Sequence, residues 1–153
     1  MKPFRFTLES VYRLRHEAVE RSNDHLAREM LELKREQQNL DQVEERMEQA
    51  REGFRDAVSS GSESGLVVQL RQFMVSVEQE RIHRESIIEG IKAKVKSCQN
   101  ALIATKQKLE AIEKIRAKRL GEHKAKWTRE EQRELDEMMI RSGGVKQMRV
   151  DFA

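Results

Sequence analysis

One short stretch of this sequence of 153 residues reads Ser59-Ser60-Gly61-Ser62-Glu63-Ser64-Gly65. Four serines and two glycines within seven residues favour a turn. Apolar residues recur at helical spacing on both sides of it, and Ser142-Gly143-Gly144 predicts the end of the second helical stretch. We therefore expect an all-α fold, a long antiparallel two-helix coiled-coil hairpin in a single domain over residues 1–153. Helix 1 is expected at about 7–58, the turn at 59–65, helix 2 at about 66–141 and a C-terminal tail at 142–153.

The stretch before the turn carries a column of bulky apolar residues at intervals of seven, which is typical of a helix with one face against another helix. Its members are Tyr12, Val19, Leu26, Leu33, Leu40, Met47 and Phe54. The stretch after the turn carries two columns, one of Leu70, Val77, Ile91, Cys98, Thr105 and Ile112, the other of Met74, Ile88, Val95, Leu102 and Leu109. If the chain reverses at Ser62, facing residues have numbers that sum to about 124, so Met47 meets Val77 and Leu26 meets Cys98.

Charged residues interrupt this interface between the helices, at Arg15, Glu29, Glu36, Arg81, Arg84 and Arg116. One interpretation is that their aliphatic stems lie along the interface while the charges reach solvent. The other is that a partner protein completes the interface. The helix that starts near Leu8 has facing positions only as far as Arg116, so residues 117–141 are expected to project as a single helix. An isolated charged helix is marginal in water, and a partner would stabilise it.

The composition argues against an enzyme. Charged residues make up 37% of the chain and aromatic residues 5%, against roughly 25% charge in a typical globular domain. The four histidines are scattered, and a hairpin offers no cleft for Cys98 to act as a nucleophile. We predict no catalytic, cofactor-binding or metal-binding residue. With 30 basic and 27 acidic residues the charge is nearly balanced, so no nucleic-acid partner is expected. No apolar run reaches the ~18 residues of a membrane span, and a lone cysteine suits a reducing compartment, so a cytoplasmic location is expected.

Three stretches together resemble the FliJ family of flagellar export proteins. The first is Phe4-Arg5-Phe6-Thr7-Leu8-Glu9-Ser10-Val11-Tyr12-Arg13-Leu14-Arg15, the second Leu70-Arg71-Gln72-Phe73 followed by Val77-Glu78, and the third Arg129-Glu130-Glu131-Gln132-Arg133-Glu134-Leu135-Asp136-Glu137. Their order and positions cover nearly the whole chain. The resemblance implies a non-catalytic component of the type III export apparatus, a coiled-coil stalk in the hexameric export ATPase that also contacts the export gate and export chaperones. It would lie at the inner face of the membrane through these partners only.

The resemblance also implies which residues contact each partner. The ATPase would be contacted by Arg13, Arg15, Lys118, Arg119 and Trp127, and the cytoplasmic domain of the gate by Met47, Phe54, Phe73 and Val77. Phe73 matches the family pattern best, whereas the other three gate candidates are also interface residues between the two helices. The alternatives are the equivalent stalk of a virulence type III secretion system and a self-associating coiled-coil scaffold.

Overall fold

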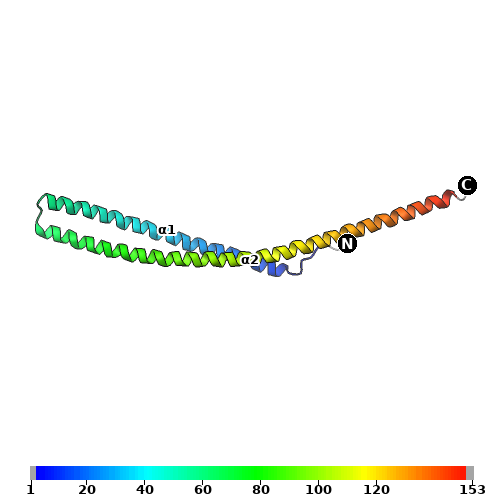
Figure 1. The fold of residues 1–153 in the computed structure, drawn as a ribbon, viewed down its shortest axis with the longest axis horizontal. Helices are drawn as coiled ribbons and strands as arrows, with labels where there is room; N and C mark the ends of the chain where they lie inside the picture. The colour runs from blue at the N-terminus through cyan, green and yellow to red at the C-terminus, as the bar shows by residue number, and fades with distance from the viewer. Residues whose placement is uncertain (1–2, 151–153) are drawn as a thin grey trace. The chain divides into compact units, whose positions relative to one another are not determined.

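The structure is a computed structural model that describes the backbone of residues 3–150 and the side chains of residues 3–143. It consists of two helices, α1 (Glu9–Ser59) and α2 (Ser64–Val150), which pack against each other (Figure 1). Within the described residues there is no β-strand. The predicted all-α helical hairpin is therefore confirmed. Neither helix, over the part that the structure describes, has a stretch long and apolar enough to cross a membrane.

The end of α1 is set by Gly61, whose φ of 69° lies in the left-handed region that glycine adopts without a Cβ penalty. The backbone N–H of Ser62 donates to the carbonyl of Ala57 at 3.0 Å, and that of Gly61 donates to the carbonyl of Val58 at 3.4 Å. These two bonds form a Schellman motif, which satisfies carbonyls that the last helical turn leaves unpaired. The glycine in the serine-rich stretch thus ends α1 as the sequence predicted.

The turn is shorter than the predicted 59–65, because Ser64 and Gly65 already belong to α2. The carbonyl of Glu63 accepts the backbone N–H groups of Leu66 at 3.1 Å and Val67 at 3.4 Å, so the helix starts directly after Glu63. A serine or glycine in the first turn of a helix needs no special backbone geometry. Composition alone therefore overestimated the turn by several residues.

The predicted end of the second helix at residue 141 is wrong, because α2 continues to Val150. Gly143 keeps a helical backbone with no positive φ. A glycine inside a helix costs roughly 1 kcal/mol relative to alanine, and the good helix formers at 146–149 favour continuation. The predicted tail at 142–153 is thus helical as far as Val150, and its last three residues, 151–153, lie outside the described residues. The first helix begins at Glu9, two residues later than predicted.

The contacts within the chain group into two compact units. The turn unit comprises residues Ala18–Thr105. The terminal unit comprises Met1–Glu17 and Lys106–Ala153. The prediction of a single domain stays a prediction.

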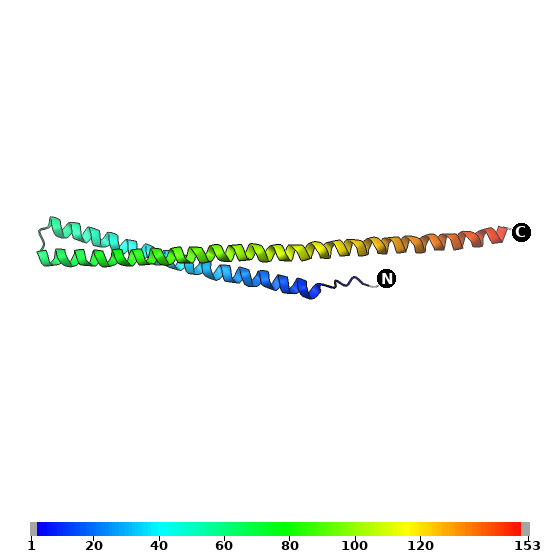
Figure 2. The ribbon, with the colours of Figure 1, turned by 60° about the horizontal axis from the view of Figure 1, so that its bottom comes forward.

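In the turn unit, α1 and α2 lie side by side and run antiparallel (Figures 1 and 2). Its core is built from Val43, Met47 and Val77, with Met74 packed against them. Met47 therefore lies with Val77, as predicted. The predicted columns of α2 also supply further buried residues, Ile88, Ile91, Cys98 and Leu102. Val43, only 1% exposed, is a core residue that the sequence columns omitted.

The burial along α1 follows the size of the residues flanking its apolar column. Val43, Ala50 and Ala57 share the heptad position that Glu29 and Glu36 occupy farther from the turn. The small and apolar members of this set are buried, whereas the two glutamates are half-buried and Leu26 and Leu33 beside them are half-buried too. Small side chains let the helices approach, while glutamates must keep a route to solvent. The tightest packing is therefore at the end nearest the turn.

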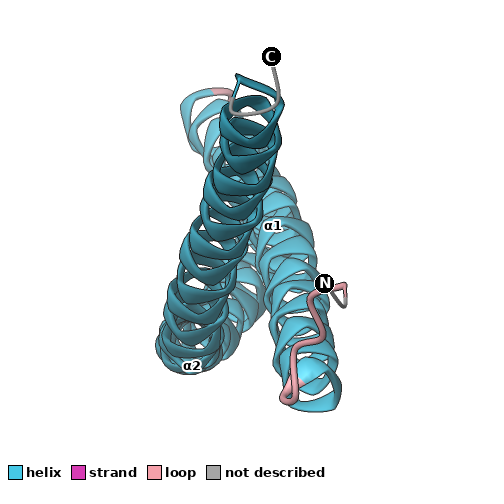
Figure 3. Cartoon of the chain, turned by 90° about the vertical axis from the view of Figure 1, so that its right-hand side faces the viewer, coloured by secondary structure: helices cyan, strands magenta, loops and turns pink. Residues whose placement is uncertain are grey.

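The terminal unit pairs the start of the chain with α2. Residues 3–6 form an extended segment before α1, and Thr7 and Leu8 form a turn that leads into the helix; both are drawn as a loop in Figure 3. Phe6 in this segment is buried, and Phe4 reaches His123 of α2. The expectation that α2 is unpaired from residue 117 is therefore wrong, because the extended segment lies beside it farther along. From Lys124 to Gly143 every residue is exposed, so a single helix is present from there.

Candidate protein-binding surfaces

The terminal unit contains a cluster of aromatic and basic side chains, which we call the terminal cluster. The Arg116 guanidinium lies over the Tyr12 ring, 5.0 Å from its centroid. The Arg119 guanidinium lies 5.8 Å from the centroid of Phe6, and the Phe4 and His123 rings meet edge to face at 5.6 Å. Such stacking of cations and rings is favourable even at partly exposed sites. The cluster attaches the extended N-terminal segment to α2.

Helical spacing explains how α2 presents this cluster. Four residues of α2 follow one another at intervals of three or four, which places them on one face of the helix. They are Arg116, Arg119, His123 and Trp127. His123 and Trp127 are 6.3 Å apart between ring centroids. Arg119 also donates a hydrogen bond to the hydroxyl of Thr7. Beside the cluster is an open groove of about 350 Å³, lined by Phe4, Tyr12, Glu113, Arg116, Ala117 and Leu120.

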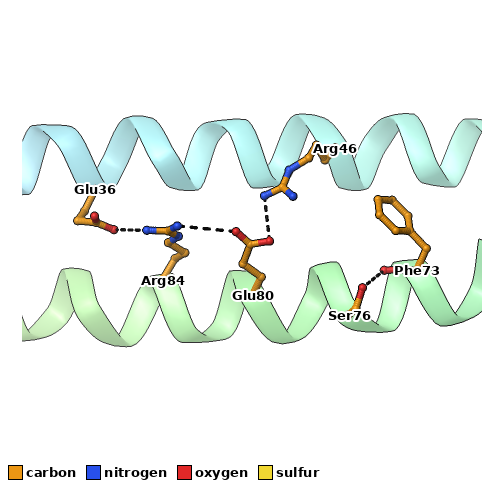
Figure 4. Close-up of polar contacts among 6 residues, drawn as sticks. All are labelled: Glu36, Arg46, Phe73, Ser76, Glu80 and Arg84. Atoms are coloured by element: carbon orange, nitrogen blue, oxygen red, sulfur yellow. Dashed lines mark hydrogen bonds and ion pairs between the residues drawn. The ribbon is translucent and has the colours of Figure 1, made fainter.

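The turn unit carries a polar ladder that crosses between the helices (Figure 4). Arg84 Nη1 donates to Glu36 Oε2 at 2.9 Å, and Arg46 Nη2 donates to Glu80 Oε2 at 2.9 Å. Arg84 Nη2 also lies 3.8 Å from Glu80 Oε1, so the four charges alternate in one connected row. Within this row, Glu36 and Arg84 occupy positions where an apolar column would otherwise continue. Two of the charged interruptions, Glu36 and Arg84, are thus paired with each other across the interface.

A second ion-pair group lies along α2, between residues of this helix alone. Arg81 donates to Glu78 at 2.6 Å and to Glu85 at 2.6 Å. The hydrogen bond from Arg81 lowers the pKa of the Glu78 carboxyl below its ordinary value. The same bond, together with the charges of Glu78 and Glu85, raises the pKa of Arg81. These groups remain solvated, so the pairs hold side chains in place and add little stability.

A family model described as "Flagellar FliJ protein" matches residues 4–147 of the chain. This chain belongs to the FliJ family. No curated protein and no solved structure gave a significant match. Membership makes it a flagellar export-related component, and the FliJ family is a non-catalytic export component. Among the side chains that the structure describes, no three His, Cys, Asp or Glu residues gather as a metal site.

The predicted ATPase-contacting residues of this FliJ-family chain all lie in the terminal unit, but in different settings. Arg119 is held by Phe6 and Thr7 of its own chain. Trp127 is 37% exposed, and its indole N–H donates to Glu131. Arg13 and Lys118 are exposed, whereas Arg15 is half-buried. The structure thus places Trp127 beside His123 and Arg119 against the N-terminal segment, while Lys118 is exposed to solvent.

Sequence reasoning missed Arg116 and His123, the two members of the terminal cluster that contact Tyr12 and Phe4. The sequence does carry a signal for this cluster, because two phenylalanines, Phe4 and Phe6, precede the first helix and the second helix carries basic residues opposite them. A heptad pattern predicts contacts only for residues within helices, so it could not predict the contacts of the segment before α1.

The predicted gate-contacting residues separate by burial. Met47 is 5% and Val77 2% exposed, and both belong to the core of the turn unit. Phe54 is half-buried. Phe73 is 46% exposed, and its ring is directed toward α1 (Figure 4); its carbonyl accepts the Ser76 hydroxyl at 2.8 Å. Of the four, Phe73 has the most exposed surface for contact with another protein. Met47 and Val77 instead pack between α1 and α2.

Proposed function

We propose that this FliJ-family chain is the stalk of the hexameric export ATPase. The observation that carries the proposal is the exposed single-helix stretch of α2 from Lys124 to Gly143, next to the terminal cluster. A helix without a neighbour is marginal in water. A ring of ATPase subunits would surround and stabilise such a helix on several sides.

The chemistry of this stretch supports a protein partner. Its exposed side chains include the basic Lys124, Lys126 and Arg129 and the large apolar Leu135, Met138 and Met139. Apolar groups exposed together mark sites of protein association. Trp127 lies among these basic residues, between Lys126 and Arg129, and tryptophan is enriched among residues that dominate binding energy. Lys118 adds a cation on the same helix.

The same proposal includes a contact with the export gate through Phe73 and a role with export chaperones. An aromatic side chain that is 46% exposed can anchor in a partner's pocket. Because these partners are part of a membrane-bound apparatus, the chain would work in the cytoplasm at the inner face of the membrane. The flagellar description of the matching family favours a flagellar system over the alternative of a virulence secretion system.

The test is the turnover of the purified hexameric export ATPase with and without this chain. Wild type is expected to raise turnover. Trp127→Ala is expected to raise the concentration needed for half of that effect by about tenfold, the usual loss at a dominant contact. Raising salt from about 0.05 M to about 0.3 M should weaken binding if Lys118 and its basic neighbours contribute.

Phe73→Ala is the matched control, because it lies in the turn unit. It should leave the ATPase response unchanged and weaken binding to the isolated cytoplasmic domain of the gate. Trp127→Ala should show the reverse pattern. If the chain neither binds the ATPase at low salt nor alters its turnover, the stalk proposal fails.

A further inference from the structure

The turn unit has a second apolar surface, on the outside of α2, which we call the outer stripe. It consists of Val68, Val75 and Ile82, which are 53%, 55% and 56% exposed. They recur at intervals of seven, the repeat of a helix surface that packs against another helix. The interface with α1 uses other positions, including Met74 and Val77. The outer stripe is therefore a helix-packing surface without a helix on it among the described residues.

The outer stripe is distinct from the surface that bears Phe73. Phe73 and Val75 are two positions apart, which places them roughly 200° apart around a helix with 3.6 residues per turn. Phe73 and the ladder residue Glu80 share one side of α2, as their spacing of seven requires. A partner seated on the outer stripe would therefore leave Phe73 accessible.

A groove adjoins the outer stripe. It measures about 360 Å³, and its apolar lining comes from Met47, Met74 and Val75. Arg51, Arg71 and Glu78 line the same groove. The methionines adapt their shape to a neighbouring side chain more readily than branched residues do. The outer stripe thus has an apolar depression at its middle, next to Val75.

The charges around the groove are ordered along the helices. Arg71 lies one turn before Val75, and Arg51 of α1 lines the groove as well. Glu78 lies one turn after Val75. The pKa of Glu78 is lowered chiefly by the hydrogen bond from Arg81, and the charge of Arg51 adds to this effect. On the far side of Val75, Glu78 and Glu85 share the guanidinium of Arg81, so two negative charges stand against one positive charge. The surface therefore changes from basic, on the side nearer the turn, to net acidic on the other side.

We propose that the outer stripe binds a second copy of this chain, antiparallel, about a two-fold axis at Val75. In this pairing Val75 meets Val75 of the second copy, and Val68 meets Ile82. The column of valines and isoleucine has two edges, one with Arg71 and Glu78 and the other with Gln72 and Gln79. In an antiparallel pair of helices each edge faces the same edge of the second copy. Arg71 therefore faces Glu78 of the second copy to within one residue, or ~1.5 Å along the axis, and this contact occurs twice.

The charge order selects this occupant. A surface that is basic on one side of its centre and acidic on the other is complementary to itself after a two-fold rotation, as an isologous interface requires. The other edge of the stripe also matches itself, since Gln72 faces Gln79 of the second copy. A parallel pair would instead bring opposite edges together, so Arg71 and Glu78 would face the edge that carries Gln72 and Gln79 and would gain no charge pairing. The arrangement does not depend on the proposed stalk function.

The dimer should be weak. Three apolar residues per chain and two pairs of charges cover much less than the ~1,600 Å² of a standard stable interface. An interface of this size is typical of transient association, so we expect a dissociation constant in roughly the micromolar range. The dimer would form and separate as concentration changes.

Sedimentation velocity of the full chain over a concentration series tests the proposal. Wild type should shift from monomer to dimer over roughly micromolar concentrations. Val75→Glu should raise the dissociation constant at least about tenfold, because it places two carboxylates together at the axis. Ile103→Glu is the control, since Ile103 is equally exposed but has no facing position on the outer stripe.

The charge-reversal variants Arg71→Glu and Glu78→Arg give a sharper result. Each alone places like charges opposite each other and should abolish the dimer. Mixed in equal amounts, the two variants should form a heterodimer, because each then supplies the charges that the other lacks. The double variant should dimerise by itself. Lys34→Glu is the charge control, and circular dichroism checks that each variant remains helical.

Disulfide trapping tests the register. In a Cys98→Ala background, Val75→Cys should form a cross-linked dimer on mild oxidation. Val68→Cys alone should not, because two such residues would lie ~21 Å apart along the axis; mixed with Ile82→Cys it should cross-link. A monomer at all concentrations, or a dimer that Val75→Glu and the charge reversals leave unchanged, would overturn the proposal.

Discussion

Arg116 on α2 lies over the ring of Tyr12 on α1, with 5.0 Å between the guanidinium carbon and the ring centroid. The same guanidinium is 3.7 Å from the carboxylate of Glu9, in the first turn of α1. One arginine therefore holds the first two turns of α1 to α2 by two different interactions. The flanking contacts of Arg119 with Phe6 and Thr7 extend this attachment to the segment before the helix.

Replacing Arg116 by alanine should loosen the start of α1. A cation over a ring at a partly exposed site contributes about 0.5–1 kcal/mol, and the exposed pair with Glu9 adds little. We expect amide hydrogen exchange over residues 9–17 to become about three- to fivefold faster, while exchange in the turn unit stays unchanged. Arg116→Lys, which keeps the charge but loses the planar stacking, should give an intermediate rate. Equal protection in all three proteins would mean that the stacking does not hold α1.

The ladder predicts opposite effects of single and double substitution. Arg84 occupies a place in the column of Val77 and Ile91, and its Nε is buried with no acceptor among the described residues. Arg84→Leu alone leaves the half-buried Glu36 without its cation, with only the Asn39 amide as a partner at 3.1 Å, and should destabilise the chain by about 1–3 kcal/mol. Adding Glu36→Leu removes the unpaired charge and continues the apolar column. The double variant should therefore be at least as stable as wild type.

Urea denaturation of the four proteins in this cycle measures the effect, with the midpoint and slope compared for each. Arg46→Leu alone serves as a control, because its side chain is 46% exposed and pairs only at the surface; it should change stability by less than about 1 kcal/mol. If the double variant is less stable than wild type, the pair of Glu36 and Arg84 contributes net stability that the two leucines do not replace.

The ladder also shows why the sequence predicted some features and not others. Heptad columns predicted the partners of Met47 and Val77 because packing between helices depends on period alone. The same columns identified Arg84 and Glu36 as interruptions but did not predict that they pair. Pairing across the interface depends on side-chain rotamers, which the spacing of residues does not determine. Phe4 and Phe6 lie before the helix, where no column applies, so the terminal cluster was missed. Gly143 was misread because a glycine ends a helix only where the backbone turns left-handed.

The pair of Glu78 and Arg81 predicts a pH dependence. The pKa of Glu78 is lowered in the folded chain by the hydrogen bond from Arg81, so this pair stabilises the fold above the unfolded pKa of about 4.3 and the contribution is lost as pH falls through the folded pKa. A carbon-detected NMR titration of the Glu78 carboxyl should show a midpoint below that of an ordinary glutamate. Arg81→Gln should return the midpoint to the ordinary range. A midpoint that is normal in wild type would mean that the bond does not persist in solution.

Two glycines predict opposite signs for one substitution. Gly61 has a φ of 69° at the end of α1, so a side chain there is strained although nothing lies within 4 Å of an added Cβ. Gly90 is helical and equally open. Gly90→Ala should stabilise the chain by roughly 1 kcal/mol, because alanine favours a helix. Gly61→Ala should destabilise it by roughly 1–2 kcal/mol, the cost of a left-handed L-residue. Thermal denaturation of both variants decides the matter. If Gly61→Ala is also stabilising, then α1 does not end in the Schellman motif that reverses the chain, and the antiparallel packing of the turn unit would need another origin.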